Sequence, residues 1–197
     1  MKKVGILYIC TGKYWRFWEG FYQSSEQLFL NDCDVEYFRF TDYEPFLIGS
    51  TSNITSIYQE SLEWPLPTLL RYKTFYENRE LFNNVDYLIF CNANLKFVDL
   101  ITIDNLLDSK SMFATLHPGW YGKDYKKLPF ETNENSLALV ERGESSKYVC
   151  GGFNGGKRSS FLKMSKDLAD AVESDLERDI IACWHDESHF NKFFNDQ

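Results

Sequence analysis

The sequence predicts a single α/β domain in which strands and helices alternate along the chain. Short apolar segments rich in β-branched and aromatic residues are typical of strands, and longer segments with apolar residues at helical spacing separate them. The 197 residues are 44% hydrophobic and 17% aromatic, which suffices for a substantial core. Neither an internal repeat nor a low-complexity tract marks a boundary, so we expect one domain over residues 1–197.

Five segments are expected to be strands, because they are short and apolar or alternate apolar with polar residues. They are residues 3–10, VEYFRFTD (35–42), VDYLIFC (85–91), SMFATLHP (111–118) and YVCGGFNGG (148–156), the last of which should end at its glycines. The segment 43–62 contains Pro45, Gly49 and a cluster of Ser, Thr and Asn, so we expect it to be mostly loop.

Four segments have the apolar spacing of helices. They are YWRFWEGFYQSSEQLFL (14–30), with a thick aromatic face, a segment from Pro67 through TLLRYKTFYENRELF (68–82), residues 157–179, and a last helix that includes WHDESHFNKFF (184–194). Pro67 falls in the first turn of its helix, where the missing N–H costs least.

Charge and cysteine content exclude several classes of protein. The net charge of −8 argues against a general nucleic-acid binder, which needs a basic surface. The five cysteines are odd in number and widely spread, so we expect reduced thiols in a cytoplasmic protein. The N-terminus enters an apolar run with no tripartite secretory signal, and no segment approaches the length of a membrane span.

The segment HDESH (185–189) is the first candidate for chemistry. Two histidines four apart on a helix could hold zinc, but the zinc-protease pattern needs Glu directly after the first His, and Asp186 stands there. We therefore expect no zinc site here and interpret the two histidines as hydrogen-bonding residues of a polar helix turn. A sugar site is an equally good interpretation, because an indole such as Trp184 can stack on a pyranose while Glu187 acts at its hydroxyls or anomeric carbon.

Three other segments are weak signals by themselves. The four glycines of CGGFNGG (150–156) could let a ligand approach the backbone or could turn the chain into the next helix. LHPGWYG (116–122) places His117 beside aromatic residues suited to sugar stacking, although a lone histidine is more often structural. YLIFCNANLKF (87–97) ends an apolar run with Asn92 and Asn94, whose neutral amides suit hydroxyls or phosphates better than a divalent cation.

Taken together, YLIFCNANLKF, FATLHPGWYG, CGGFNGG and WHDESHFNKF resemble, in order and spacing, the retaining glycosyltransferases that include the blood-group A and B transferases and α-1,3-galactosyltransferase. The likeness extends over YWRFWEGFYQSSEQLFL and WPLPTLLRYKTF, and it is closest to the bacterial branch. That branch lacks the Golgi anchor and has Asn-x-Asn in place of a metal-binding Asp-x-Asp. The resemblance implies a glycosyltransferase-A-type, Rossmann-like mixed sheet flanked by helices. It also implies a basic C-terminal segment, and we expect residues 1–197 to be a catalytic domain that does not include it, either because a longer chain was cut back or because the segment is absent.

The resemblance assigns roles to particular residues. Glu187 is the catalytic candidate, lying near the anomeric carbon, and no metal ligand is implied. The residues matched to the UDP-sugar donor are Ile9, Cys10, Thr11, Tyr14, Arg71, Asn92, Ala93, Asn94, Cys150, Gly151, Gly152 and Asp186; those matched to the acceptor are His117, Trp184 and Glu187. Gly152 is a small residue at the position where, in the family, a small residue admits the acetamido group of the donor. The resemblance therefore favours UDP-N-acetylgalactosamine over UDP-galactose.

The implied reaction is transfer of N-acetylgalactosamine, or galactose, in α-1,3 linkage to a terminal, 2-fucosylated galactose without a metal ion. Glu187 either forms a glycosyl-enzyme or stabilises an oxocarbenium-like ion. Arg71, Lys13 and Lys192 are the candidates for neutralising the diphosphate. A lipid-linked acceptor would bring the protein to a membrane surface. The alternatives are a carbohydrate-binding protein that has lost catalysis and a UDP-sugar hydrolase.

Overall fold

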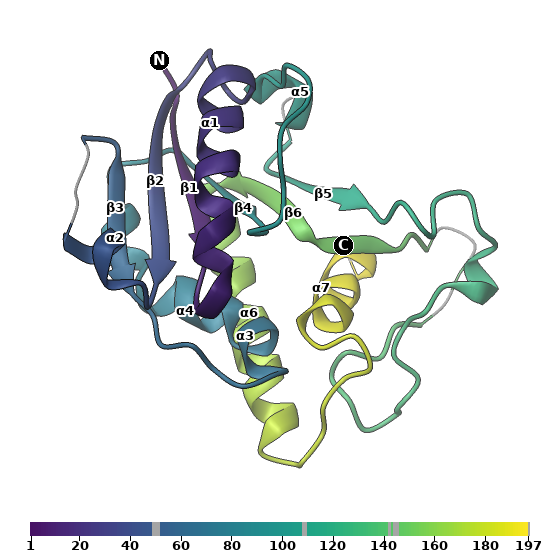
Figure 1. Ribbon diagram of the computed structural model, residues 1–197. Helices are drawn as coiled ribbons and strands as arrows, with labels where there is room; N and C mark the ends of the chain where they lie inside the picture. The colour runs from purple at the N-terminus through teal and green to yellow at the C-terminus, as the bar shows by residue number, and fades with distance from the viewer. Residues whose placement is uncertain (49–51, 108–109, 142, 144–145, 197) are drawn as a thin grey trace. The chain divides into compact units, whose positions relative to one another are not determined.

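The computed structural model describes residues 1–48, 52–107, 110–141, 143 and 146–196. It has the expected α/β fold, with a six-stranded mixed sheet in the order β3-β2-β1-β4-β6-β5 (Figure 1). The described chain divides into two compact units. The first comprises Met1–Leu62, Glu80–Phe113 and Gly152–Phe161, and the second comprises Glu63–Arg79, Ala114–Gly151 and Leu162–Gln197.

Parallel strands form the centre of the first unit. They are β1 (Lys3–Ile9), β2 (Asp34–Thr41), β3 (Ile54–Tyr58) and β4 (Tyr87–Cys91), and β6 (Val149–Lys157) pairs antiparallel with β4. Residues 4–8 of β1 are buried and Ile9 is partly buried, as their continuous apolar run predicts for a strand covered on both faces. The parallel pairing of β1 with β4 brings the carboxyl ends of these two strands to the same edge of the sheet.

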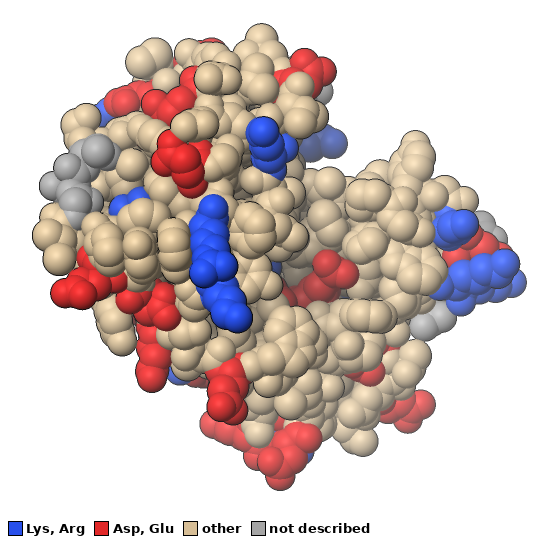
Figure 2. Space-filling view, in the orientation of Figure 1, with Lys and Arg blue, Asp and Glu red and all other residues tan. Residues whose placement is uncertain are grey.

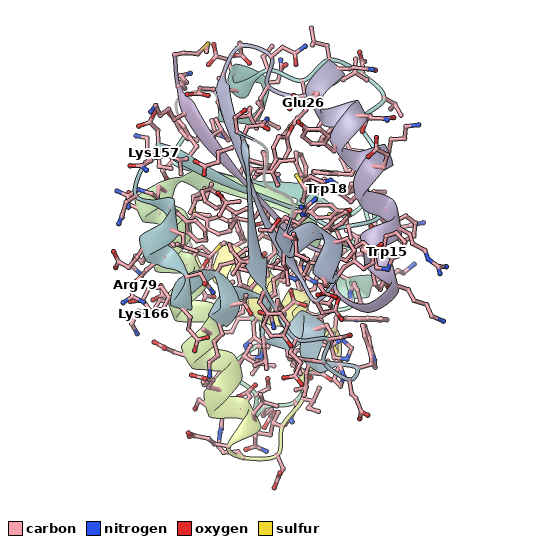
Figure 3. All side chains as sticks on the ribbon, turned by 60° about the vertical axis from the view of Figure 1, so that its left-hand side comes forward. Trp15, Trp18, Glu26, Arg79, Lys157 and Lys166 are labelled. Carbon is pink, nitrogen blue, oxygen red and sulfur yellow. The ribbon has the colours of Figure 1, made fainter. Side chains whose placement is uncertain are left out.

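The aromatic helix packs on this sheet. A 3₁₀ turn, η1 (Gly12–Phe17), leads into α1 (Trp18–Leu28), so the regular helix begins later than expected. Figure 3 shows Trp18 pointing from α1 toward the strands. Its indole packs edge-on against Tyr8 of β1 at 5.1 Å, and the guanidinium of Arg39 lies 4.6 Å from the indole centroid. Stacking on the indole compensates in part for burying this arginine.

Two expectations about secondary structure are wrong. The described residues of segment 43–62 include a helix, α2 (Glu44–Ile48), and the edge strand β3, whose β-branched residues pair with β2 although the strand is only partly buried. The segment 68–82 is interrupted, giving α3 (Leu66–Leu69), α4 (Arg71–Glu77) and a 3₁₀ helix, η2 (Arg79–Phe82). At the second break the Asn78 side chain donates to the carbonyl of Thr74, an alternative to continued helix.

The strand expected over residues 148–156 is confirmed as β6, which runs through all four glycines and ends at Lys157. A β-carbon on Gly155 would lie 2.6 Å from the Leu88 carbonyl oxygen, and one on Gly156 would lie 2.3 Å from the Ser111 carbonyl oxygen. These two glycines therefore allow close approach of neighbouring backbones within the sheet and do not form a turn. Helix α6 (Arg158–Leu176) follows directly, close to the range expected.

The second unit consists mainly of helices and loops. Its elements include α3, α4, the 3₁₀ helix η3 (Tyr125–Lys127), most of α6 and α7 (Asp186–Asn195). The end of β5 (Met112–Leu116) also belongs to it, whereas α5 (Ile103–Leu107) lies in the first unit. A small apolar cluster of Leu128, Phe130, Val140 and Tyr148 supports the loop after β5. None of the helices within the described residues combines the length and apolar character needed to cross a bilayer.

Candidate functional site

In the first unit, the residues expected to bind the sugar donor follow two neighbouring strands. Ile9 ends β1 and Cys10 follows it, while Asn92 follows β4, so these segments lie at one edge of the parallel sheet. The side chain of Cys10 is fully buried, and its carbonyl accepts a hydrogen bond from Thr41 Oγ1 at 3.1 Å. Ala93 is also buried, and its carbonyl accepts from Tyr8 Oη at 2.9 Å. The side chains of Cys10 and Ala93 therefore lie in the core at this edge, and neither is exposed to a ligand.

The two asparagines at this edge form a linked pair. Asn92 Nδ2 donates to Asn94 Oδ1 at 3.1 Å, and the Asn92 amide N–H donates to the Gly152 carbonyl at 2.8 Å. The side chains thus offer neutral amide groups, whereas a divalent cation prefers carboxylate oxygens. The two amides therefore offer a magnesium or manganese ion no charged ligand.

A hollow of about 430 Å³ opens beside Asn94. Its other lining residues are Lys13, Tyr14, Arg16 and Phe17, and the two aromatic rings lie 5.8 Å apart. Figure 2 shows positive charge over the lower end of α1, in a protein whose net charge is −8. Two cations, two exposed rings and an amide suit a ligand that carries an aromatic base and phosphates. Arg16 was not singled out from the sequence, although it lies between the aromatic residues that follow Thr11.

In the second unit, a buried ion pair supports the catalytic candidate. Arg71 of α4 lies with its Nη1 atom 3.3 Å from Asp186 Oδ2 and 3.3 Å from the Gly151 carbonyl, to which it donates. Glu187 Oε2 accepts from the Gly151 N–H at 2.8 Å. Arg71 and Asp186 are 8% and 4% exposed, so the ion pair is buried and each charge has an opposite charge beside it. Four residues assigned from sequence are thus brought together: Arg71, Gly151, Asp186 and Glu187.

The start of α7 differs from the expected HDESH helix. His185 is the N-cap, with φ of 53° and ψ of −129°, so it lies outside the helix and does not share a helical face with His189. The two carboxylates occupy the first turn, where the helix dipole favours negative charge. His189 is buried with its Nε2 atom 3.5 Å from Asp175 Oδ2, and burial lowers its pKa. Neither of its ring nitrogens has a hydrogen bond within the described residues, so the expected hydrogen-bonding role is not seen for His189.

The residues expected at the acceptor differ in exposure. His117 Nδ1 accepts from the Gly119 N–H at 3.1 Å, which leaves the proton of the neutral ring on Nε2. Trp184 is 52% exposed and directly precedes His185. Trp64, which was not singled out from the sequence, is 71% exposed and packs edge-on against His185 at 4.9 Å. Exposed indoles of this kind offer flat apolar faces to a sugar ring.

The remaining assigned residues occupy unremarkable positions. Thr11 caps η1, Tyr14 is 56% exposed in η1, and Cys150 is a partly buried residue of β6. Lys192, considered for the diphosphate, pairs with Asp196 on its own helix at 3.0 Å.

A further residue missed from sequence is Tyr148. Burial raises the pKa of its phenol, and the Glu187 charge adds to that effect, so the phenol stays protonated at neutral pH.

Turnover is expected to decline as the pH falls through about 6, because burial raises the pKa of Asp186 to about 6 against the opposing charge of Arg71. A carboxyl with a raised pKa is charged above that pH and neutral below it, so the Arg71–Asp186 pair is lost on the acid side. The pH profile of kcat measures this effect. Asp186→Asn should abolish the inflection near pH 6; an inflection that persists in this variant would assign the titration to another group.

Comparison with known proteins places the chain in a family. Residues 2–197 match the model of glycosyltransferase family 6. The chain is 32% identical over 191 residues to the O-antigen biosynthesis glycosyltransferase WbnI of Escherichia coli, covering 97% of this chain and 81% of that protein. It is 28% identical to histo-blood group ABO system transferase 1 of Rattus norvegicus, covering 96% of this chain and 56% of the rat protein.

A third relative is the human globoside α-1,3-N-acetylgalactosaminyltransferase 1, at 26% identity over 198 residues. The alignment covers 97% of this chain and 56% of the human protein. The chain therefore spans little more than half the length of these two mammalian relatives. The family match extends over nearly the whole chain. Two of the motifs that carry the resemblance, CGGFNGG and WHDESHFNKF, contribute Gly151, Asp186 and Glu187 to the arrangement around Glu187. The chain belongs to glycosyltransferase family 6.

Proposed function

We propose that this glycosyltransferase moves N-acetylgalactosamine from UDP to the 3-hydroxyl of a terminal galactose with retention of the α configuration. The observation that carries the proposal is the contrast between two adjacent carboxylates. Asp186 is buried and paired with Arg71, whereas Glu187 is partly buried and is oriented by the Gly151 N–H. Glu187 is therefore the carboxylate of this pair that is available to a substrate.

Glu187 acts at the anomeric carbon in this proposal. As the bond between that carbon and the UDP oxygen breaks, positive charge develops on the sugar, and the carboxylate stabilises it directly or forms a transient bond to the carbon. The acceptor oxygen then bonds to the carbon on the face that UDP leaves. The acceptor's proton passes to the departing phosphate oxygen, so UDP is released and charge is balanced.

The diphosphate is held by protein cations in this proposal, without a metal ion. Lys13 and Arg16 line the hollow beside Asn94 in the first unit, and these two cations would face the phosphates. The amides of Asn92 and Asn94 can bond hydroxyl or phosphate oxygens but suit a divalent ion poorly. Lysine and arginine can provide the charge stabilisation that a metal ion supplies elsewhere.

The preference for N-acetylgalactosamine rests on Gly152. A β-carbon there would meet only Asn92, at an ordinary contact distance of 3.5 Å, so the glycine leaves space for a ligand and is not required by packing. The human globoside relative, which is named as an α-1,3-N-acetylgalactosaminyltransferase, supports the same donor. UDP-galactose is the alternative donor.

A 2-fucosylated galactose on a bacterial glycan is the proposed acceptor, with the exposed indole of Trp184 stacking on the sugar and His117 donating from Nε2. The Escherichia coli relative, named for O-antigen biosynthesis, supports this class of glycan. A lipid-linked acceptor would place the reaction at the cytoplasmic face of a membrane, with the protein bound there only peripherally.

The proposal predicts that transfer survives removal of divalent ions. The protein is incubated with UDP-N-acetylgalactosamine, with and without a 2-fucosylated galactoside, in excess chelator and separately with added manganese. Acceptor-dependent product should form at a similar rate in both conditions, since the charge on the diphosphate is met by side chains. Product is measured by mass spectrometry, and UDP release is measured in parallel.

Each other outcome contradicts a stated part of the proposal. Transfer that stops in chelator and returns with manganese would contradict metal independence. Release of UDP without glycosylated product would identify a hydrolase, and sugar binding without either product would identify a carbohydrate-binding protein. A faster reaction with UDP-galactose would reverse the assigned donor preference.

A further inference from the structure

Helix α7 is held against β6 and the residues before it by side chains at regular intervals. Glu187, Asn191 and Asn195 are four residues apart on the helix, and their partners Gly151, Val149 and Lys147 are two residues apart on the neighbouring chain. Four helical residues advance about 6 Å and two extended residues about 6.6 Å, so successive side chains meet successive backbone groups. All of these residues belong to the second unit.

Each asparagine forms the two bonds that a paired strand would form. Asn191 Oδ1 accepts from the Val149 N–H at 2.8 Å, and Asn191 Nδ2 donates to the Val149 carbonyl at 2.8 Å. Asn195 binds the N–H and carbonyl of Lys147 in the same way, both at 3.1 Å. The helix face thus replaces a neighbouring strand in binding this backbone. A carboxylate could accept but not donate in this position, so the amide is specifically required.

The second amide hydrogen of each asparagine binds α7 itself. Asn191 Nδ2 donates to the Glu187 carbonyl at 2.8 Å, and Asn195 Nδ2 donates to the Asn191 carbonyl at 2.8 Å. One side chain therefore connects the backbone of Glu187 to that of Val149. Asn191 is fully buried, so its polar atoms depend on these bonds.

The series changes chemistry at Glu187. The carboxylate accepts from the Gly151 N–H at 2.8 Å, and the Gly151 carbonyl instead receives Arg71 Nη1 at 3.3 Å. At Gly151, therefore, Glu187 binds the N–H and Arg71 binds the carbonyl. At Val149 and Lys147, one asparagine side chain binds both groups. Glu187 thus contacts the backbone at the same spacing as the two asparagines, but with a charged carboxylate.

We infer that Asn191 and Asn195 are positioning residues for glycosyl transfer, fixing the axial position of α7 so that Glu187 meets Gly151. The inference rests on the proposed role of Glu187. A displacement of about 1 Å at a reacting group can lower a rate by about 100-fold, so loss of these bonds should lower kcat more than it changes substrate binding. Neither asparagine contacts the substrate in this inference, and both act through Glu187.

The test uses Asn191→Ala and Asn195→Ala, with Asp196→Asn as the matched control. Asp196 is the C-cap of α7 and pairs with Lys192 at 3.0 Å, but within the described residues no hydrogen bond joins its side chain to Lys147, Val149 or Gly151. We expect kcat to fall about 100-fold for Asn191→Ala and about 5-fold for the more exposed Asn195→Ala, with the KM for UDP-sugar within about 2-fold. Asp196→Asn should match the unmodified protein. Unchanged kcat in folded Asn191→Ala or Asn195→Ala would overturn the inference.

A double-mutant cycle separates positioning from general stability. In a Glu187→Gln background, Asn195→Ala should not lower the residual rate further, because the group it positions has been removed. An equal 5-fold loss in both backgrounds would overturn the inference. If Asn191→Ala does not fold, Asn195→Ala alone decides, because its contacts lie at the more exposed end of α7. Retained turnover in Glu187→Gln alone would instead contradict the proposed function.

Discussion

Replacing Glu187 by Gln is expected to lower kcat by about 1000-fold, since a neutral amide cannot stabilise positive charge on the anomeric carbon as a carboxylate does. The amide oxygen of Gln can still accept from the Gly151 N–H, so the contact that is 2.8 Å long in the unmodified protein is preserved. UDP binding should therefore change by less than about 2-fold. Steady-state kinetics give kcat, and calorimetric titration gives the Kd of UDP.

The matched control for this variant is Glu177→Gln. Glu177 is an exposed carboxylate of the second unit, just after α6, and its substitution removes the same charge from the protein. It should leave kcat unchanged. Near-normal turnover in Glu187→Gln would remove Glu187 from the mechanism, and a parallel loss of UDP affinity would indicate a binding role instead.

Substituting Gly156 by Ala is expected to lower the free energy of unfolding by about 3 kcal/mol or to prevent folding, because overpacking a rigid contact is costly. The added β-carbon would lie 2.3 Å from the Ser111 carbonyl oxygen and 2.8 Å from Met112 Cα. Both neighbours are backbone atoms, so a rotamer change cannot relieve the clash. The midpoint of urea denaturation, measured with its slope, reports the change.

Gly152→Ala is the control for this effect, since its β-carbon would meet Asn92 at an ordinary 3.5 Å. Its free energy of unfolding should stay within about 0.5 kcal/mol of that of the unmodified protein. Equal loss of stability in the two variants would show that β6 requires glycine for a reason other than close packing between strands.

The central strands of the fold could be predicted because their apolar runs are continuous. β1 and β4 are covered on both faces, so burial alone determines their composition. β3 was missed because an edge strand is half exposed and contains polar residues typical of loops. The breaks around α4 were missed because helical apolar spacing does not report where side chains such as Asn78 compete with the backbone.

The glycines of CGGFNGG show why the site could be predicted only in part. Gly152 has space beside it, whereas Gly155 and Gly156 are pressed against backbone from β4 and from the residue before β5. All of these residues are glycines, so the sequence does not distinguish them. The space beside each one depends on neighbours that are distant along the chain. Glu187 was identified through the resemblance of WHDESH, but Asn191 was not, because its role depends on the backbone of Val149.

The asparagine contacts of α7 have a consequence for the effect of salt. Bonds between neutral amides and backbone are not screened by ions, and the Arg71–Asp186 pair is too buried for strong screening. Lys13 and Arg16, by contrast, are exposed on the hollow beside Asn94. Raising the ionic strength should therefore weaken the attraction of an anionic ligand to the hollow while leaving Glu187 in place. Salt and substitution thus provide independent ways of perturbing binding and chemistry in this protein.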